Sequence, residues 1–390
     1  MKTSLIIILC ICVLIFIALI VYDRTKNEKT DAVSTVSTSK TISNSIMGNN
    51  DWILILKLGP GGDNCDSNGD TYSCKYLTAT SSNPTFTLSS DKIDTSTDSS
   101  AYKFVTAYKD KDNQSMMWND QGDKNCGKAP NISAHEKGGI VLNKEGTNGV
   151  WMESSNPHWG FHKGFTYGMN NKPPGIQTDY MQHILLVSLN SKEDVKNMLD
   201  VMANSNLCVQ DGSIDGFTPW TTKTTNRGPT ITRSLTSGLT IVGKADGDDT
   251  TDIWDSLRTQ YCKKGKNMTV LTYCSPECPI GKGKPKDPIN KSLTDLMNTR
   301  ELAFEKVAAN DKKRCTSDAC KNAKSVLSTL CGLKFDPFSV NHSKIGICLD
   351  NNVVIVGGNN HSVKSQGPRG GMFAVIDNKT LSDKLKCLFN

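Results

Sequence analysis

Histidine is scarce in this chain, at 6 of 390 residues, and several motifs that depend on it are missing. His158 and His162 lie four residues apart, but no Glu stands between them as the metalloprotease motif requires. Two close cysteine pairs lack a His at zinc-finger spacing, so disulfides are favoured there and zinc is the alternative. The pairs are Cys274 with Cys278 and Cys315 with Cys320.

A strong charge imbalance and short repeats are absent too. Lys and Arg number 45 against 39 Asp and Glu, and the net charge of +6 indicates a mild preference for polyanions. Such an excess identifies no nucleic-acid site, because affinity for phosphates depends on local clusters of cations. The Lys-rich segment 281–288 is most simply a solvated surface loop, with phosphate binding as its alternative.

The N-terminal segment 1–22 contains an apolar run of about twenty residues, which is long enough to cross a bilayer. The run exceeds the usual signal-peptide core and no small-x-small cleavage site follows it, so we expect a transmembrane signal anchor. A cleaved signal peptide, and hence a secreted protein, is the alternative. Residues 23–49 are rich in Ser, Thr, Lys and Asn, a composition typical of a disordered stalk.

The remaining cysteines indicate an oxidising compartment. Two of the 14 lie in the apolar run and leave an even number, which suits a set of disulfides. Several N-x-S/T sequences are acceptors for N-linked glycans, which are also added in the secretory pathway. We therefore expect the folded part in a lumen or outside the cell: the secretory pathway, a lysosome-like compartment or a viral envelope. The acceptors include Asn113, Asn131, Asn267, Asn290 and Asn378, together with Asn341 and Asn360, which fall on the candidate active site.

Apolar patterns predict both strands and helices after the stalk. Segments 51–58, 138–143 and 183–189 are typical of strands. Helices are expected to begin near Ser191, Ser292 and Thr380. Ser191 is a favourable cap, and an apolar stripe follows it. The stripe consists of Val195, Met198, Leu199 and Met202.

Two of the six histidines begin the same pattern, a His-x-Lys followed by a predicted strand: His135 with Lys137, and His342 with Lys344. Alternation along an extended chain sends residues two apart to one face, so each pair is able to address one phosphate. Cleaving a phosphodiester requires a nucleophile, a proton for the leaving oxygen and cations beside the charged phosphate. Two imidazoles and two ammonium groups meet these needs without metal or other cofactor, and mildly acidic pH keeps an acid His protonated.

Further motifs, in the same order, resemble the deoxyribonuclease II family, a branch of the phospholipase D-like phosphodiesterases, over about residues 51–390. In the first half, residues 118–121, 134–138 and 149–157 are similar to the family's Tyr-Asn-Asp-Gln, His-Thr-Lys-Gly and Trp-Leu-Val-His-Ser-x-Pro segments. In the second half, residues 342–344, 356–360 and 369–371 are similar to its His-Ser-Lys, Val-Gly-Asp-x-Asn and Arg-Gly-Gly segments.

The resemblance implies an α/β fold, a phospholipase D-like sandwich of two similar halves with one shared active-site cleft. Each half, 50–215 and 216–390, is expected to contain a central mixed sheet flanked by helices and one His-x-Lys. The implied reaction is metal-independent hydrolysis of double-stranded DNA through a phosphohistidine, leaving 3′-phosphate ends. A monomer would suffice, because each half supplies one motif, and an oligomer is left open.

Roles for individual residues also follow from the resemblance. His135 is expected to be the nucleophile and His342 the general acid, with Lys137 and Lys344 beside the phosphate. The remaining substrate contacts are expected from Ser155, Asn360 and Trp159.

Several positions depart from the family patterns. Gly358 stands where an acidic residue is expected, and Ser154 where a His is expected. Leu142 and Leu349 replace the Asp that completes the phospholipase D motif, which disfavours a lipase. Two alternatives therefore stay open: a catalytically inactive, membrane-tethered protein that binds nucleic acid or another surface, and a lipid phosphodiesterase.

Overall fold

The computed structural model describes residues 41–58, 74–93, 96–119, 134–156, 182–218, 228–245, 252–263, 268–271, 342–360 and 369–389. The predicted anchor at 1–22 and the helix expected from Ser292 lie outside these residues, as do Trp159 and the two close cysteine pairs. Among the helices that the structure describes, none has the length and apolar character needed to cross a bilayer.

The last part of the expected stalk is folded, so a disordered stalk through residue 49 is wrong there. Helix α2 (Ile42–Met47) begins at Thr41, whose side chain accepts a hydrogen bond from the amide of Asn44. Ile46 and Met47 are buried against the outer face of a sheet. A six-residue helix is too short to be stable alone, so packing rather than composition decides its structure.

The strands form two sheets, and every pairing between described strands is antiparallel. The first sheet has the order β3 (Thr87–Lys92), β2 (Lys75–Thr80), β1 (Trp52–Lys57), β7 (Gln182–Leu189), β6 (Gly149–Ser154), β5 (Gly138–Leu142), β4 (Gln114–Trp118) and β8 (Val209–Ser213). The second has the order β11 (Met268–Leu271), β12 (Ile345–Cys348), β13 (Val353–Gly357), β14 (Gly371–Asp377), β10 (Thr240–Lys244) and β9 (Ile231–Ser234).

This topology confirms an α/β fold and corrects the expectation of mixed sheets. Strands β4 to β7, and likewise β11 to β14, follow one another both along the chain and across their sheet. Each of these strands runs opposite to the one before it.

The two sheets repeat one arrangement of strands and helices. A central strand (β1 or β10), an outer helix (α3, Ser100–Tyr108, or α6, Ile253–Tyr261), four successive strands and a final helix occur in the same order twice. The final helices are α5 (Lys192–Ser205) and α10 (Lys379–Phe389). All described strands of the first sheet precede residue 215, and all those of the second follow it.

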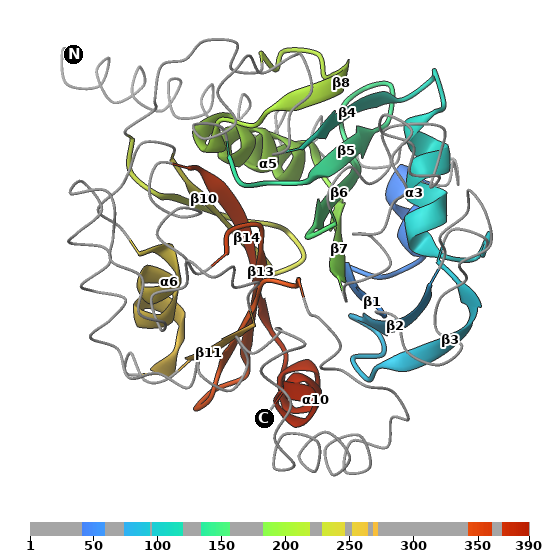
Figure 1. Cartoon of the computed structure of the whole chain (residues 1–390). Coiled ribbons are helices and arrows are strands. Elements are labelled where there is room, and N and C mark those ends of the chain that lie inside the picture. The colour runs from blue at the N-terminus through green and yellow to red at the C-terminus, as the bar shows by residue number, and fades with distance from the viewer. Residues whose placement is uncertain are drawn as a thin grey trace, which may run out of the picture. The chain divides into compact units, whose positions relative to one another are not determined.

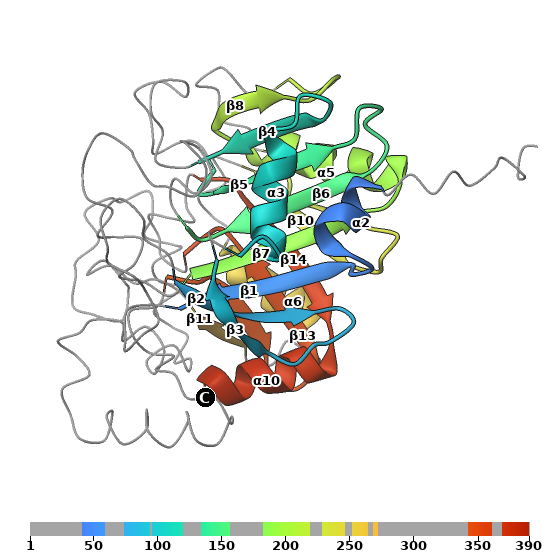
Figure 2. The same ribbon diagram turned by 90° about the vertical axis from the view of Figure 1, so that its right-hand side faces the viewer.

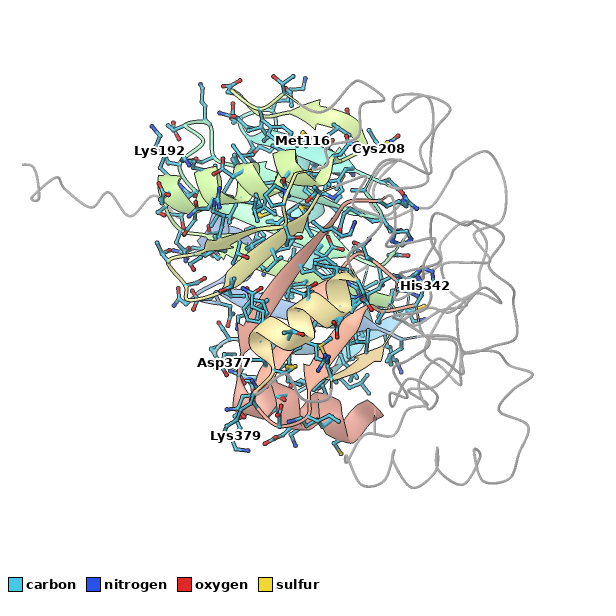
Figure 3. All side chains as sticks on the ribbon, turned by 90° about the vertical axis from the view of Figure 1, so that its left-hand side faces the viewer. Met116, Lys192, Cys208, His342, Asp377 and Lys379 are labelled. Atoms are coloured by element: carbon cyan, nitrogen blue, oxygen red, sulfur yellow. A yellow bond between two sulfur atoms is a disulfide. The ribbon has the colours of Figure 1, made fainter. Side chains whose placement is uncertain are left out.

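The elements pack in layers (Figure 1). Helices α2 and α3 cover the outer face of the first sheet (Figure 2), and α6 covers the outer face of the second (Figure 3). Helices α5 and α10 lie between the sheets, where residues from both helices and both sheets form one apolar core. Helix α5, from the first half, contacts β9, β10 and β14 of the second sheet.

Several predicted elements are confirmed. Strands β1, β5 and β7 fall on the predicted segments, and helix α5 begins at its predicted cap, because the side chain of Ser191 accepts from the amide of Asp194. Helix α10 buries Leu381 and Leu385, as its apolar pattern predicts. Disulfides are present too, including one between Cys262 and Cys348.

Candidate active site

The two His-x-Lys pairs stand at equivalent places, immediately before β5 and β12. These strands begin at Gly138 and Ile345, so the pairs precede the regular strands rather than lying within them. Strand alternation therefore does not explain where their side chains point. In Figure 3, His342 lies at the end of the strands opposite to Asp377, the last residue of β14.

The equivalence of the halves is visible in their hydrogen bonds. Beside the first pair, the amide of Ser154 donates to the carbonyl of Lys137 at 2.8 Å, and in the second half the amide of Gly357 donates to that of Lys344 at 3.1 Å. One residue on, the amide of Ser155 donates to the carbonyl of His183, the second residue of β7, at 3.0 Å. The amide of Gly358 likewise donates to the carbonyl of Met372, the second residue of β14, at 3.3 Å. Ser155 and Gly358 are therefore counterparts.

Each imidazole of the two His-x-Lys pairs is held by the half to which it does not belong. Nδ1 of His135 lies 2.7 Å from the carbonyl oxygen of Gly358, and Nδ1 of His342 lies 3.2 Å from that of Ser155. An Nδ1–H that donates to a carbonyl leaves the Nε2 lone pair available. The Gly358 contact therefore orients the His135 ring for chemistry at Nε2, and the Ser155 contact does the same for His342 in the tautomer that carries its proton on Nδ1.

The seam between the halves is hydrogen-bonded on both sides of this crossing. The amide of His135 donates to the carbonyl of Gly370 at 3.0 Å, and a guanidinium nitrogen of Arg369 donates to the carbonyl of Ala134 at 3.2 Å. The hydroxyl of Ser205 donates to the carbonyl of Gly371 at 3.1 Å. Remote parts of the chain are thus joined at the site itself.

Charge at the site is concentrated around His342. Nζ of Lys344 lies 2.9 Å from its Nδ1, an atom that serves either this ammonium or the Ser155 carbonyl, according to its tautomer. Burial, reinforced by the positive charges of Lys344, Lys137 and His135, holds the pKa of His342 well below its ordinary value. The structure thus brings together all four residues of the two pairs.

Ser155 lies at the site, but its side chain is directed into the protein. Its hydroxyl donates to Oε1 of Gln182 at 2.6 Å and accepts from the amide of His183 at 2.9 Å. The residue is 1 % exposed, so it contributes to the site through the carbonyl that holds His342. In this structure the Ser155 hydroxyl is occupied by these two hydrogen bonds, and its contact with substrate stays a prediction.

Asn360 lies two residues beyond the carbonyl that holds His135, and it is partly exposed. Its neighbour Asn359 is buried and donates to the carbonyl of Gly370 at 3.3 Å. The indole of Trp254 donates to the carbonyl of Asn359 at 3.0 Å. Two hydrogen bonds from different elements therefore fix the turn at Asn359 beside the site. The third expected substrate contact, Trp159, lies outside the described residues.

Three buried titratable residues at the site escaped the sequence reasoning. His183 is fully buried, and its Nδ1 accepts the backbone N–H of Lys344 at 3.1 Å, so it anchors the start of β12. Burial and the charges of Lys344 and Lys137 lower the pKa of His183 well below its ordinary value. It is therefore a neutral structural histidine, and its only signal in the sequence is a His at the start of an apolar strand.

Glu136 and Glu153 form a pair of buried carboxyl groups beside the two lysines. Burial raises the pKa of Glu153 well above its ordinary value, and the Glu136 carboxylate raises it further, against the opposing effect of Lys137 and Lys344. Glu153 is therefore a neutral acid. In the sequence, both residues are recognisable only as departures from the family patterns, which have Thr at position 136 and Val at position 153. Among the described residues, no three His, Cys, Asp or Glu side chains are grouped to hold a metal ion.

Comparison with known proteins identifies the family. The family model of deoxyribonuclease II matches residues 48–390. The chain belongs to the deoxyribonuclease II family. Membership in this family indicates a hydrolase that cuts DNA, and the matched range includes every residue of the site.

Two other comparisons add less. Among solved structures, a phosphatidylserine synthase of Haemophilus influenzae Rd KW20 is similar at 11 % identity and a TM-score of 0.29. The match covers 67 % of this chain and 63 % of the synthase, so it spans under two thirds of that protein. The search of curated proteins found no match.

Proposed function

We propose that this deoxyribonuclease II family member is an acid endonuclease that hydrolyses double-stranded DNA at the site formed by the two His-x-Lys pairs, without a divalent metal. The observation that carries this proposal is the crossed support of the imidazoles, with His135 held by Gly358 and His342 by Ser155. Two rings fixed in this way beside Lys137 and Lys344 provide a nucleophile, an acid and charge stabilisation around one phosphate.

The reaction we propose has two steps. Nε2 of one His attacks phosphorus, the bond from phosphorus to the 5′-oxygen breaks, and the other His gives its proton to the leaving alkoxide. That second His then takes a proton from water, which attacks the phosphohistidine and releases a 3′-phosphate and the free imidazole. The ammonium groups of Lys137 and Lys344 balance the charge on the non-bridging oxygens in both steps.

We assign attack to His342 and acid catalysis to His135, which reverses the order implied by the resemblance. A nucleophilic imidazole must be neutral and the acid must be protonated. At about pH 5 an ordinary His is mostly protonated. Burial and the neighbouring positive charges lower the pKa of His342 and so favour its neutral form. An acidic optimum is therefore compatible with a His nucleophile.

Plasmid cleavage tests the activity. The full chain is used, because a truncation that removed α2 would expose the sheet on which this helix packs, and it is purified in detergent because of its apolar N-terminal segment. The protein is incubated with plasmid and EDTA at about pH 5. The parent and a Lys196→Ala control, whose Lys is exposed on α5, should cut DNA, whereas His135→Ala and His342→Ala should not. Binding without cutting by the parent would support the tethered binding protein, and turnover of phosphatidylcholine instead would support the lipid phosphodiesterase.

Trapping the intermediate tests the assignment of roles. A single-turnover reaction is quenched in alkali and digested, and the peptide that carries the oligonucleotide phosphate is identified by mass spectrometry. We expect the adduct on the peptide of His342. An adduct on His135 would restore the order that the resemblance implies.

The departures at Gly358 and Ser154 support an inactive protein less than the sequence suggests. His135 is oriented by a backbone carbonyl of residue 358, which any residue possesses. Ser154 donates its hydroxyl to the carbonyl of His183 at 3.3 Å, so that position has a structural use.

Cellular location also remains a proposal. We propose that residues 1–22 anchor the protein in a membrane and that the nuclease, active as a monomer, lies in a lumen or outside the cell. The disulfide between Cys262 and Cys348 supports an oxidising compartment. Protease protection of intact membranes tests this placement, because digestion of the folded part from the cytosolic side would contradict it.

A further inference from the structure

The side chain between His135 and Lys137 bridges the two halves. Glu136 is 1 % exposed, and its Oε1 accepts the backbone N–H of Met372, the second residue of β14. A buried carboxylate that accepts an amide N–H is favoured in its ionised form. The negative charge of Glu136 is one of the causes that raise the pKa of the neighbouring Glu153 carboxyl.

Gly358 lies directly beneath this carboxylate. A Cβ built on Gly358 would overlap the carboxyl carbon and both oxygens of Glu136, and these are the three atoms nearest to it. Any side chain at 358 would therefore need the volume that Glu136 occupies. The family pattern has the opposite distribution, with an acidic residue at 358 and Thr at 136.

A closed circuit of contacts connects this carboxylate to the catalytic ring. Glu136 holds the amide of Met372, and the carbonyl of Met372 accepts from the amide of Gly358 at 3.3 Å. The carbonyl of Gly358 in turn lies 2.7 Å from Nδ1 of His135, the residue next to Glu136 in the chain. Displacing the Glu136 carboxylate would therefore loosen the backbone at Met372 and Gly358, whose carbonyl orients the His135 imidazole.

We propose that Glu136 is the positioning residue for His135: its carboxylate fills the place of a side chain at 358, fixes Met372 and Gly358, and so holds the Gly358 carbonyl against the ring. This inference rests on the proposed nuclease function, because it assigns a means of orientation to one of the two catalytic histidines. It also explains why residue 358 is glycine: the turn there accepts no Cβ while Glu136 is present.

A four-variant cycle in the full chain tests the proposal: parent, Glu136→Thr, Gly358→Asp and the double variant. A ring misplaced by about 1 Å costs up to about 100-fold in rate, so we expect each single variant to lower kcat/KM by about that factor, mainly through kcat. The double variant should recover most of the loss, because it restores the family's distribution of groups. Glu193→Thr, at an exposed position of α5, is the matched control.

Two results would overturn the proposal while the parent still cuts DNA. One is a double variant no faster than the slower single variant, and the other is a pair of single variants as fast as the parent. Thermal unfolding of all four proteins is measured alongside, so that a variant that fails to fold is recognised. A lowered melting temperature that recovers in the double variant without recovery of kcat would reduce Glu136 to a purely structural contact.

Carbethoxylation of His135 provides a readout that does not require DNA cleavage. Diethyl pyrocarbonate modifies neutral imidazole nitrogens, and mass spectrometry measures its rate at His135 as a function of pH. We expect the profile to shift in each single variant, to return in the double variant and to stay unchanged in Glu193→Thr. A parent that does not cut DNA refutes the proposed function, whereas identical His135 profiles in all five proteins refute the positioning role.

Discussion

Replacing Glu153 with Gln should stabilise the protein at neutral pH and leave its stability unchanged in acid. Glu153 is fully buried, and its carboxyl pKa is raised in the folded state by burial and by Glu136. The folded protein therefore binds a proton that the unfolded chain releases above about pH 4.5. Gln has nearly the same shape and needs no proton.

The magnitude follows from proton linkage. Between the unfolded pKa and the raised folded pKa, the folded state holds one more proton, so the free energy of unfolding falls as pH rises, by about 1.4 kcal/mol per pH unit. Stability from this carboxyl is thus fully present below the unfolded pKa and is lost as pH rises through the folded pKa. At pH 7, the Gln variant should be more stable than the parent, by about 1.4 kcal/mol for each pH unit that separates the unfolded pKa from the folded pKa or from pH 7, whichever is lower.

Guanidinium unfolding in buffers from about pH 4.5 to 7.5, followed by tryptophan fluorescence, measures this difference for the parent and Glu153→Gln. The difference between the parent and Glu193→Gln, on the exposed surface of α5, should not change with pH, because this variant keeps Glu153 and an exposed carboxyl is nearly equally hydrated in both states. A difference between parent and Glu153→Gln that stays constant with pH would refute the reasoning. So would a parent that is the more stable protein at pH 7.

Three further changes have expected outcomes. Lys344→Met should lower plasmid cleavage by about 100- to 1,000-fold, because a group that stabilises transition-state charge is lost, whereas Lys196→Met should not; equal rates would contradict this role. Replacing Cys262 and Cys348 by Ala opens a loop of 86 residues and should lower the free energy of unfolding by about 2–5 kcal/mol in guanidinium titrations. Leu381→Ala should cost about 2–5 kcal/mol in the same assay, because it leaves a cavity between the sheets.

The two similar halves contribute equivalent groups to one shared site. Each half contributes an imidazole and an ammonium group before one strand and a carbonyl after the next, at Ser155 and Gly358. Because each carbonyl holds the imidazole of the other half, neither half by itself contains both a candidate histidine and the carbonyl that orients it. Loosening the seam should therefore reduce activity before it unfolds either sheet.

The sequence by itself determined the local elements and the chemistry. Apolar patterns located β1, β5 and β7, and Ser191 located the start of α5, because alternation and capping depend only on neighbouring residues. The paired His-x-Lys motifs located the four residues that the structure brings together at the candidate site. Family membership was recognisable because the motifs keep their order along the chain.

Only the tertiary structure decided how these parts cooperate. Short helix α2, placed in a stalk by its composition, is folded because the first sheet covers its apolar residues. The strand directions depend on which elements become neighbours, so an expected mixed sheet proved antiparallel. His183 and Glu136 took their roles from contacts across the seam, between residues more than 150 positions apart, and no local pattern records such contacts.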